Sequence, residues 1–126
     1  MLMRTRAPKI LLIDDDPNGR ALYLSALLPL GCCVIEAGNG RDGYECFSQE
    51  GADLVISVDS PGDGTGLQMV KKIRQADEGV PVLFLKRDGQ DDLDAEAKKL
   101  GGCKVLREPF YPRQLRTVVE AALHQS

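Results

Sequence analysis

Acidic side chains cluster near the start of the chain, where Asp14, Asp15 and Asp16 follow one another directly. Three adjacent carboxylates repel each other unless a positive charge is near, so the cluster is typical of a cation site. Asp16 precedes Pro17, and that pair also suits the cap and first position of a helix, which would leave the other two carboxylates solvated. We favour a shared role, in which Asp16 caps a helix while Asp14 and Asp15 face a cation.

The acidic cluster follows the first of five short apolar runs, each of a length typical of a β-strand. Their near-continuous hydrophobicity indicates strands buried on both faces. Apolar residues recur at helical spacing between them, as in Leu67, Val70 and Ile73. This alternation predicts an α/β fold, a parallel sheet with helices on both faces. The predicted strands are Lys9–Ile13, Cys33–Glu36, Asp53–Val58, Val80–Leu85 and Lys104–Leu106.

Glycine and proline mark the predicted helix ends. Gly31 can end the first helix, and Gly101 and Gly102 follow the fourth. Thr65 precedes the third helix, and Pro112 opens the fifth.

A parallel sheet brings the carboxyl ends of its strands to one edge, where ligands and reactive groups collect. That edge should receive the acidic cluster together with residues that follow the later strands. These are Val58, Asp59, Lys86, Arg107 and Glu108. Function is therefore expected at this edge.

Length and composition limit the class of protein. We expect residues 1–126 to form a single domain with its core at about 9–123, since one core typically organises about 100–200 residues. A net charge of −3 gives no basic field for binding nucleic acid. The apolar run Ile10–Ile13 is too short for a secretion signal or a membrane span, so we expect a cytoplasmic location and no membrane partner.

The cysteines and the single histidine predict no catalytic or metal site. Cys32, Cys33, Cys46 and Cys103 lack the spacing of metal ligands, and we expect them to be reduced and mostly buried. His124 is expected to be a solvated residue at a helix end.

Four fragments, in this order, resemble the receiver domain of two-component response regulators. They are Ile10–Pro17, Asp53–Val58 leading to Gly66 and Leu67, Val80–Leu85, and Glu108–Phe110. The resemblance covers essentially the whole chain. It implies a flavodoxin-like (βα)5 doubly wound parallel sheet with strand order 2-1-3-4-5. It also implies an acidic pair that helps to hold Mg²⁺, here Asp14 and Asp15, and a cis bond between Glu108 and Pro109.

The departures from the family pattern fall on the residues that carry its chemistry. In the ungapped register the phospho-acceptor position holds Val58, the hydroxyl position holds Lys86, and the lysine position holds Glu108. Asp59 is an alternative acceptor, but adjacent strand residues point to opposite faces, so using it requires a bulge. We therefore expect a degenerate active site with no catalytic residue, formed by Asp14, Asp15, Val58, Lys86, Glu108 and Pro109.

The charge balance suggests what replaced the metal. Asp14, Asp15 and Glu108 face one cation, Lys86, whose ammonium can take the place of Mg²⁺ as a built-in counter-ion. The alternative is that Lys86 extends into water and the site is open.

Three functional hypotheses remain from the sequence. The leading one is a signalling receiver domain that is not an enzyme and acts through contacts with a kinase or output domain, or by self-association through its fourth and fifth helices. No cofactor is expected under it. The second is a phosphorylatable receiver that uses Asp59 and Mg²⁺. The third is a small flavodoxin-like protein that binds a nucleotide or flavin, although no glycine-rich phosphate loop follows the first strand.

Overall fold

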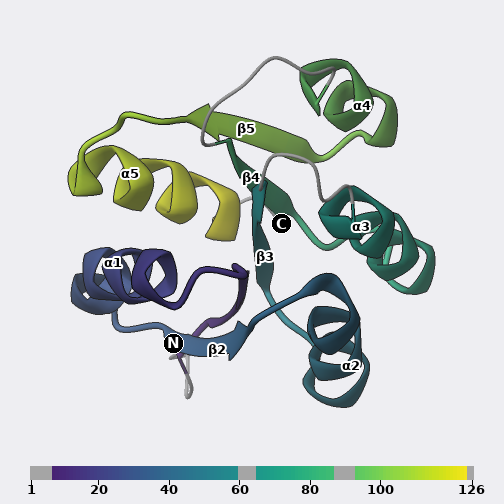
Figure 1. Cartoon of the computed structure of the whole chain (residues 1–126), viewed down its shortest axis with the longest axis horizontal. Coiled ribbons are helices and arrows are strands. Elements are labelled where there is room, and N and C mark those ends of the chain that lie inside the picture. The colour runs from purple at the N-terminus through teal and green to yellow at the C-terminus, as the bar shows by residue number, and fades with distance from the viewer. Residues whose placement is uncertain (1–6, 60–64, 87–92, 125–126) are drawn as a thin grey trace, which may run out of the picture.

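Five parallel strands form one sheet in the order β2-β1-β3-β4-β5, as expected (Figure 1). The computed structural model describes residues 7–59, 65–86 and 93–124. The strands are β1 (Lys9–Ile13), β2 (Cys33–Ala37), β3 (Leu54–Asp59), β4 (Val82–Lys86) and β5 (Cys103–Arg107). The helices are α1 (Pro17–Leu27), α2 (Gly40–Glu50), α3 (Thr65–Ala76), α4 (Leu93–Leu100) and α5 (Pro112–Leu123), with a 3₁₀ turn at Leu28–Leu30. This topology confirms the predicted fold class.

Helices cover both faces of the sheet. Figure 1 shows α1 and α5 on one side and α2, α3 and α4 on the other. Side chains alternate between the two faces along each strand. In β1, Ile10 and Leu12 join the hydrophobic cluster that includes α1 and α5, whereas Leu11 and Ile13 join the cluster that includes α2 and α3. The sheet therefore separates two hydrophobic cores and contributes side chains to both.

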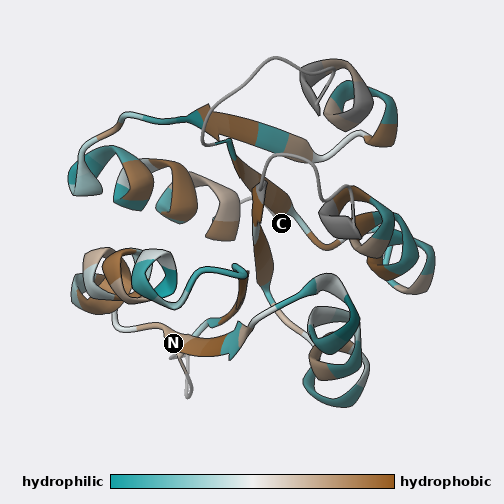
Figure 2. Cartoon of the chain, viewed as in Figure 1, coloured by the Kyte–Doolittle hydropathy of each residue, from teal (hydrophilic) through white to brown (hydrophobic). Residues whose placement is uncertain are grey.

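The three central strands are the most deeply buried. All five residues of β4 are buried, and so are four of the five in β1. The edge strands β2 and β5 are mostly half-buried or exposed. Figure 2 shows the same contrast, with hydrophobic central strands and helices whose hydrophilic residues lie on their outer sides.

Most predicted element boundaries are confirmed within one or two residues. Asp16 is the N-cap of α1, and its side chain accepts a hydrogen bond from the Asn18 amide at 3.1 Å. Gly31 follows the 3₁₀ turn with a φ of 68°, a conformation that favours glycine. The fourth strand begins two residues later than predicted, at Val82, because the Val80 amide bonds back to the Asp77 carbonyl and Pro81 has no amide hydrogen to donate.

Gly43 fixes how closely α2 approaches β1. A Cβ atom at this position would lie 2.7 Å from Ile13 Cδ1 and 2.9 Å from Ile13 Cγ1, well inside van der Waals contact. Ile13 is itself buried beneath α2. A side chain at position 43 therefore cannot fit unless the helix or Ile13 moves.

We predict that Gly43→Ala lowers the free energy of unfolding by about 1–3 kcal/mol, because overpacking outweighs the gain in helix propensity. Ile13→Val removes the Cδ1 atom, so the double variant should lose less stability than the sum of the two single variants. Chemical denaturation measures all three, with the exposed Ser48→Ala in the same helix as control. Strict additivity of the two substitutions would contradict the close contact.

Candidate functional site

The acidic cluster lies at the carboxyl end of β1, as predicted. The Asp14 amide donates to the Ala37 carbonyl at 3.0 Å, which extends the pairing with β2 by one residue. Asp14 is only 1% exposed, and its Oδ1 accepts a hydrogen bond from the Asp16 amide at 3.0 Å. Asp15 is exposed. The three carboxylates thus occupy different environments, and the capping role of Asp16 is confirmed.

Arg20 is a second cation near this cluster that the sequence reasoning missed. Its Nη1 donates to the Asp14 carbonyl oxygen at 2.6 Å, and its Nε lies 3.4 Å from Glu36 Oε1. The sequence does contain a clue to this contact. Arg20 lies four positions after the cap Asp16, and residues with this spacing lie on the same side of a helix. Arg20 ties α1 to the ends of β1 and β2.

Val58 lies near the end of β3 and packs into the core. It is 7% exposed and belongs to the hydrophobic cluster that also contains Leu85 and Tyr23. The strand register sets Ser57 opposite Ile13, so Val58 is one residue further along, level with Asp14. A valine side chain has no nucleophilic atom and cannot accept a phosphoryl group.

Asp59 is the last residue of β3 and is paired in register with Lys86. The structure describes its backbone pairing, and its side chain lies outside the described part of the chain. The orientation of the Asp59 carboxylate, and with it the choice between Val58 and Asp59, therefore stays a prediction.

Lys86 is the last residue of β4 and is 1% exposed. The alternative in which its ammonium extends into water is therefore wrong. An ionised ammonium is costly to bury unless anions or hydrogen-bond acceptors surround it. Asp14 is equally buried at the same edge of the sheet. A direct ion pair of Lys86 with Asp14 or Asp15 stays a prediction that this burial favours.

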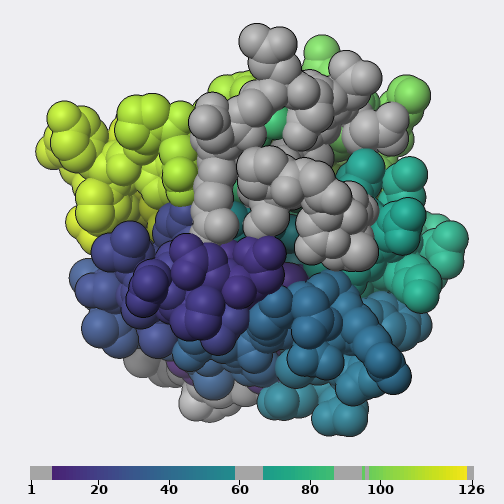
Figure 3. Space-filling view, in the orientation of Figure 1, coloured from purple at the N-terminus to yellow at the C-terminus, as the bar shows by residue number. Residues whose placement is uncertain are grey.

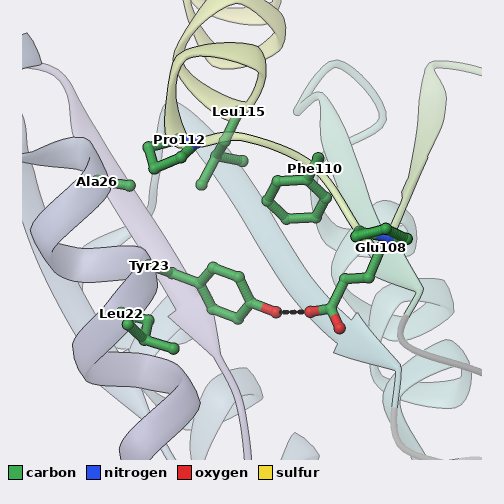
Figure 4. Close-up of a pocket in the computed structure, with 8 residues that line it drawn as sticks. Leu22, Tyr23, Ala26, Glu108, Phe110, Pro112 and Leu115 are labelled. Carbon is green, nitrogen blue, oxygen red and sulfur yellow. Dashed lines mark hydrogen bonds between the residues drawn. The ribbon is translucent and has the colours of Figure 1, made fainter.

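Glu108 turns toward α1. Its Oε2 accepts a hydrogen bond from the Tyr23 hydroxyl (Figure 4). Its amide donates to the Lys86 carbonyl at 2.9 Å. The peptide bond to Pro109 is cis, as predicted. The carboxylate that stands in the family's lysine position therefore has a partner on a helix, which the sequence did not indicate.

The charge at the sheet edge disfavours a Mg²⁺ site among the described residues. Mg²⁺ takes six oxygen ligands, several of them water, and is usually held by one or two protein carboxylates. Among the described side chains there is no group of three or more Asp, Glu, His or Cys positioned to hold a metal ion. Lys86 adds a buried positive charge at the same edge, which opposes a second cation.

The cysteines are less buried than predicted. All four are free, but Cys33 is exposed and the other three are only half-buried. The reason is that Cys33 lies on the edge strand β2, whose outer positions face solvent. Burial raises the pKa of the Cys103 thiol, and the nearby Arg74 opposes this shift. His124 is exposed at the end of α5, as expected.

Figure 3 shows that the segment at the start of α1, drawn in purple, lies at the surface beside α2, drawn in blue. This segment follows the carboxyl end of β1 and includes the exposed Asp15 and Pro17. Asp15 is therefore reached from outside, while Asp14 and Lys86 lie beneath the surface.

Comparison with known proteins identifies the family of this chain. Residues 10–120 match the response regulator receiver domain, so this chain belongs to that family. Luminescence regulatory protein LuxO of Vibrio campbellii is 29% identical over 115 residues, which cover 91% of this chain and 25% of LuxO. The chain thus spans about a quarter of the length of such relatives. It is a receiver domain of the kind found in two-component signalling.

Two further similarities cover nearly whole proteins. Sporulation initiation phosphotransferase F of Bacillus subtilis is 28% identical over 116 residues, which cover 91% of this chain and 93% of the relative. The chemotaxis protein CheY4 of Vibrio cholerae has a solved structure with a TM-score of 0.82 and 25% identity, covering 92% of this chain and 98% of CheY4. These similarities support the flavodoxin-like fold. They do not test the substitutions at Val58, Lys86 and Glu108.

No helix in the described ranges is both long and apolar enough to cross a membrane.

We predict that Tyr23 and Glu108 couple by about 1.5 kcal/mol, the usual contribution of a hydrogen bond to a charged group. A double-mutant cycle with Tyr23→Phe and Glu108→Leu measures this coupling by chemical denaturation, and it separates the pair from the other contacts of each side chain. Tyr44→Phe, on the opposite face of the sheet, is the control for losing a phenol hydroxyl. A coupling energy near zero would show that the bond does not join α1 to the end of β5.

Proposed function

We propose that this receiver domain is a non-enzymatic signalling module that works through protein contacts without aspartyl phosphorylation. The observation that carries the proposal is the burial of Lys86 at the sheet edge that also holds Asp14. A cation supplied by the chain competes with Mg²⁺ for the same carboxylate oxygens. Without a metal ion, the charge on an incoming phosphoryl group is not neutralised.

Two further positions support the same proposal. Val58 fills the predicted acceptor position with a packed apolar side chain. Glu108 brings a negative charge where a donor to phosphoryl oxygens is expected, and it is engaged by Tyr23. Each change alone weakens phosphoryl transfer, and together they remove the nucleophile, the metal site and the cationic donor.

The partners we propose are a kinase or an output domain, with self-association through α4 and α5 as a further possibility for the same surface. The last turn of α4 carries Lys98 and Lys99, both exposed, which suit an acidic partner. Asp91 and Asp92, which precede this helix in the sequence, lie outside the described residues. The match to the receiver-domain family does not support the nucleotide or flavin hypothesis.

We predict that the wild-type chain gains no phosphoryl group when it is incubated with phosphoramidate and Mg²⁺, as measured by intact mass. The triple variant Val58→Asp, Lys86→Thr, Glu108→Lys should gain one phosphoryl group, because it regains a nucleophile and a cationic donor and loses the competing ammonium. A wild-type adduct that disappears in Asp59→Asn would contradict the proposal and establish Asp59 as the acceptor.

We also predict that Mg²⁺ stabilises Lys86→Thr but not the wild type. If the variant binds Mg²⁺ with a Kd of about 1 mM, then 10 mM Mg²⁺ adds about 1.4 kcal/mol, which raises its Tm by several degrees. Without Mg²⁺ the variant should be less stable than wild type, since the buried Asp14 loses a nearby cation. Thermal melts across a Mg²⁺ titration measure this, with the exposed Lys104→Thr as control. Equal Mg²⁺ stabilisation of wild type and Lys86→Thr would contradict the counter-ion role.

A further inference from the structure

A cavity of about 590 Å³ lies between α1 and the segment that leads from β5 into α5. This volume is in the range of sites for small organic ligands. Figure 4 shows its apolar walls, which include Leu22 and Ala26 from α1 together with Phe110 and Leu115. Leu115 is fully buried at the base of the cavity, whereas Leu22 is 71% exposed at its rim.

Glu108 is the one charged side chain among the described residues that line this cavity. Its Oε2 accepts the Tyr23 hydroxyl, while an ionised carboxylate has two oxygens and can accept about four hydrogen bonds. The carboxylate therefore retains capacity for a second donor, one that comes from a ligand. A negative charge in a mostly apolar cavity favours a cationic group there.

The aromatic rings beside Glu108 favour the same kind of ligand. The rings of Tyr23 and Phe110 are stacked, with centroids 6.2 Å apart and planes inclined by 26°. The face of an aromatic ring attracts an organic cation, and its apolar surface accommodates a carbon skeleton. Figure 4 shows both rings directed into the space between α1 and the start of α5.

The start of α5 offers few free amide groups that would hold an anion. Helix N-termini bind anions through free backbone N–H groups. Here Pro112 occupies the first position and has no N–H, and the Tyr111 amide already donates to Gln114 Oε1 at 2.6 Å. The carboxylate therefore disfavours an anionic ligand, and the helix end offers few amide donors to offset it.

We infer that this cavity binds a small organic amine. The protonated amine bonds to the Glu108 carboxylate, and its apolar body packs against Phe110 and Leu22. The inference shares Glu108 with the degenerate site, but it does not require that the sheet edge stays unphosphorylated, because the amine contacts neither the acidic cluster nor Val58.

Three indole compounds test the charge preference on the wild-type protein. Tryptamine is cationic, tryptophol is neutral and indole-3-acetate is anionic, with closely similar apolar bodies. A titration followed by ¹H–¹⁵N NMR should show tryptamine binding with a Kd on the order of 1 mM, with shifts centred on residues 22, 26, 110 and 115. Tryptophol should bind on the order of tenfold more weakly, and indole-3-acetate should bind weakest.

Glu108→Gln should weaken tryptamine binding on the order of tenfold and leave tryptophol binding unchanged, because only the amine loses its charged partner. The matched control is Glu45→Gln, which changes a carboxylate in a smaller groove between α2 and α3. It should have no effect on tryptamine binding.

Several results would overturn the inference. They are equal affinity for the three compounds, no shift at 10 mM tryptamine, equal effects of the two glutamate substitutions, or shifts centred on α2 and α3. Shifts around Leu22 that grow with protein concentration alone would also overturn it, because a second copy of the chain would then cover the cavity. Even if Glu108→Gln fails to fold, the order of the three affinities for the wild-type protein still tests the inference.

Discussion

The ammonium group of Lys86 lies in the interior at the carboxyl edge of the sheet. Burial of that charge constrains which side chains can surround it. A buried cation is tolerated only where anions or hydrogen-bond acceptors surround it. Asp14 is buried at the same edge, directly after β1, which β3 separates from β4. In this account the ammonium balances the acidic pair, and the site has no remaining need for a metal ion.

The other substitutions fit the same balance of charge. Val58 adds no further carboxylate to the edge and packs with Leu85 and Tyr23. Glu108 does add a negative charge, but its carboxylate accepts a hydrogen bond from Tyr23 and so is directed toward α1. In our proposal, the positions that would handle a phosphoryl group instead serve the core, an internal charge balance and a contact between α1 and the β5–α5 connection.

Local patterns predicted the strands, the helices and the edge of the parallel sheet, whereas the resemblance to receiver domains supplied the strand order. Apolar runs and helical spacing indicated the strands and helices, and parallel strands necessarily bring residues 14, 58, 86 and 108 to one edge. Sequence reasoning could not predict the Tyr23–Glu108 bond, which joins residues 85 positions apart and depends on the packing of α1. It also left open whether Lys86 faces water, because a long side chain at a strand end can be buried or extended.

A crystal structure grown with Mg²⁺ and beryllofluoride, an analogue of the phosphoryl group, tests the central claim most directly. The account predicts that the Lys86 ammonium lies within ion-pair distance of Asp14 or Asp15, with neither Mg²⁺ nor beryllofluoride bound at this edge. Beryllofluoride attached to the Asp59 carboxylate, with Mg²⁺ held by Asp14 and Asp15, would contradict it.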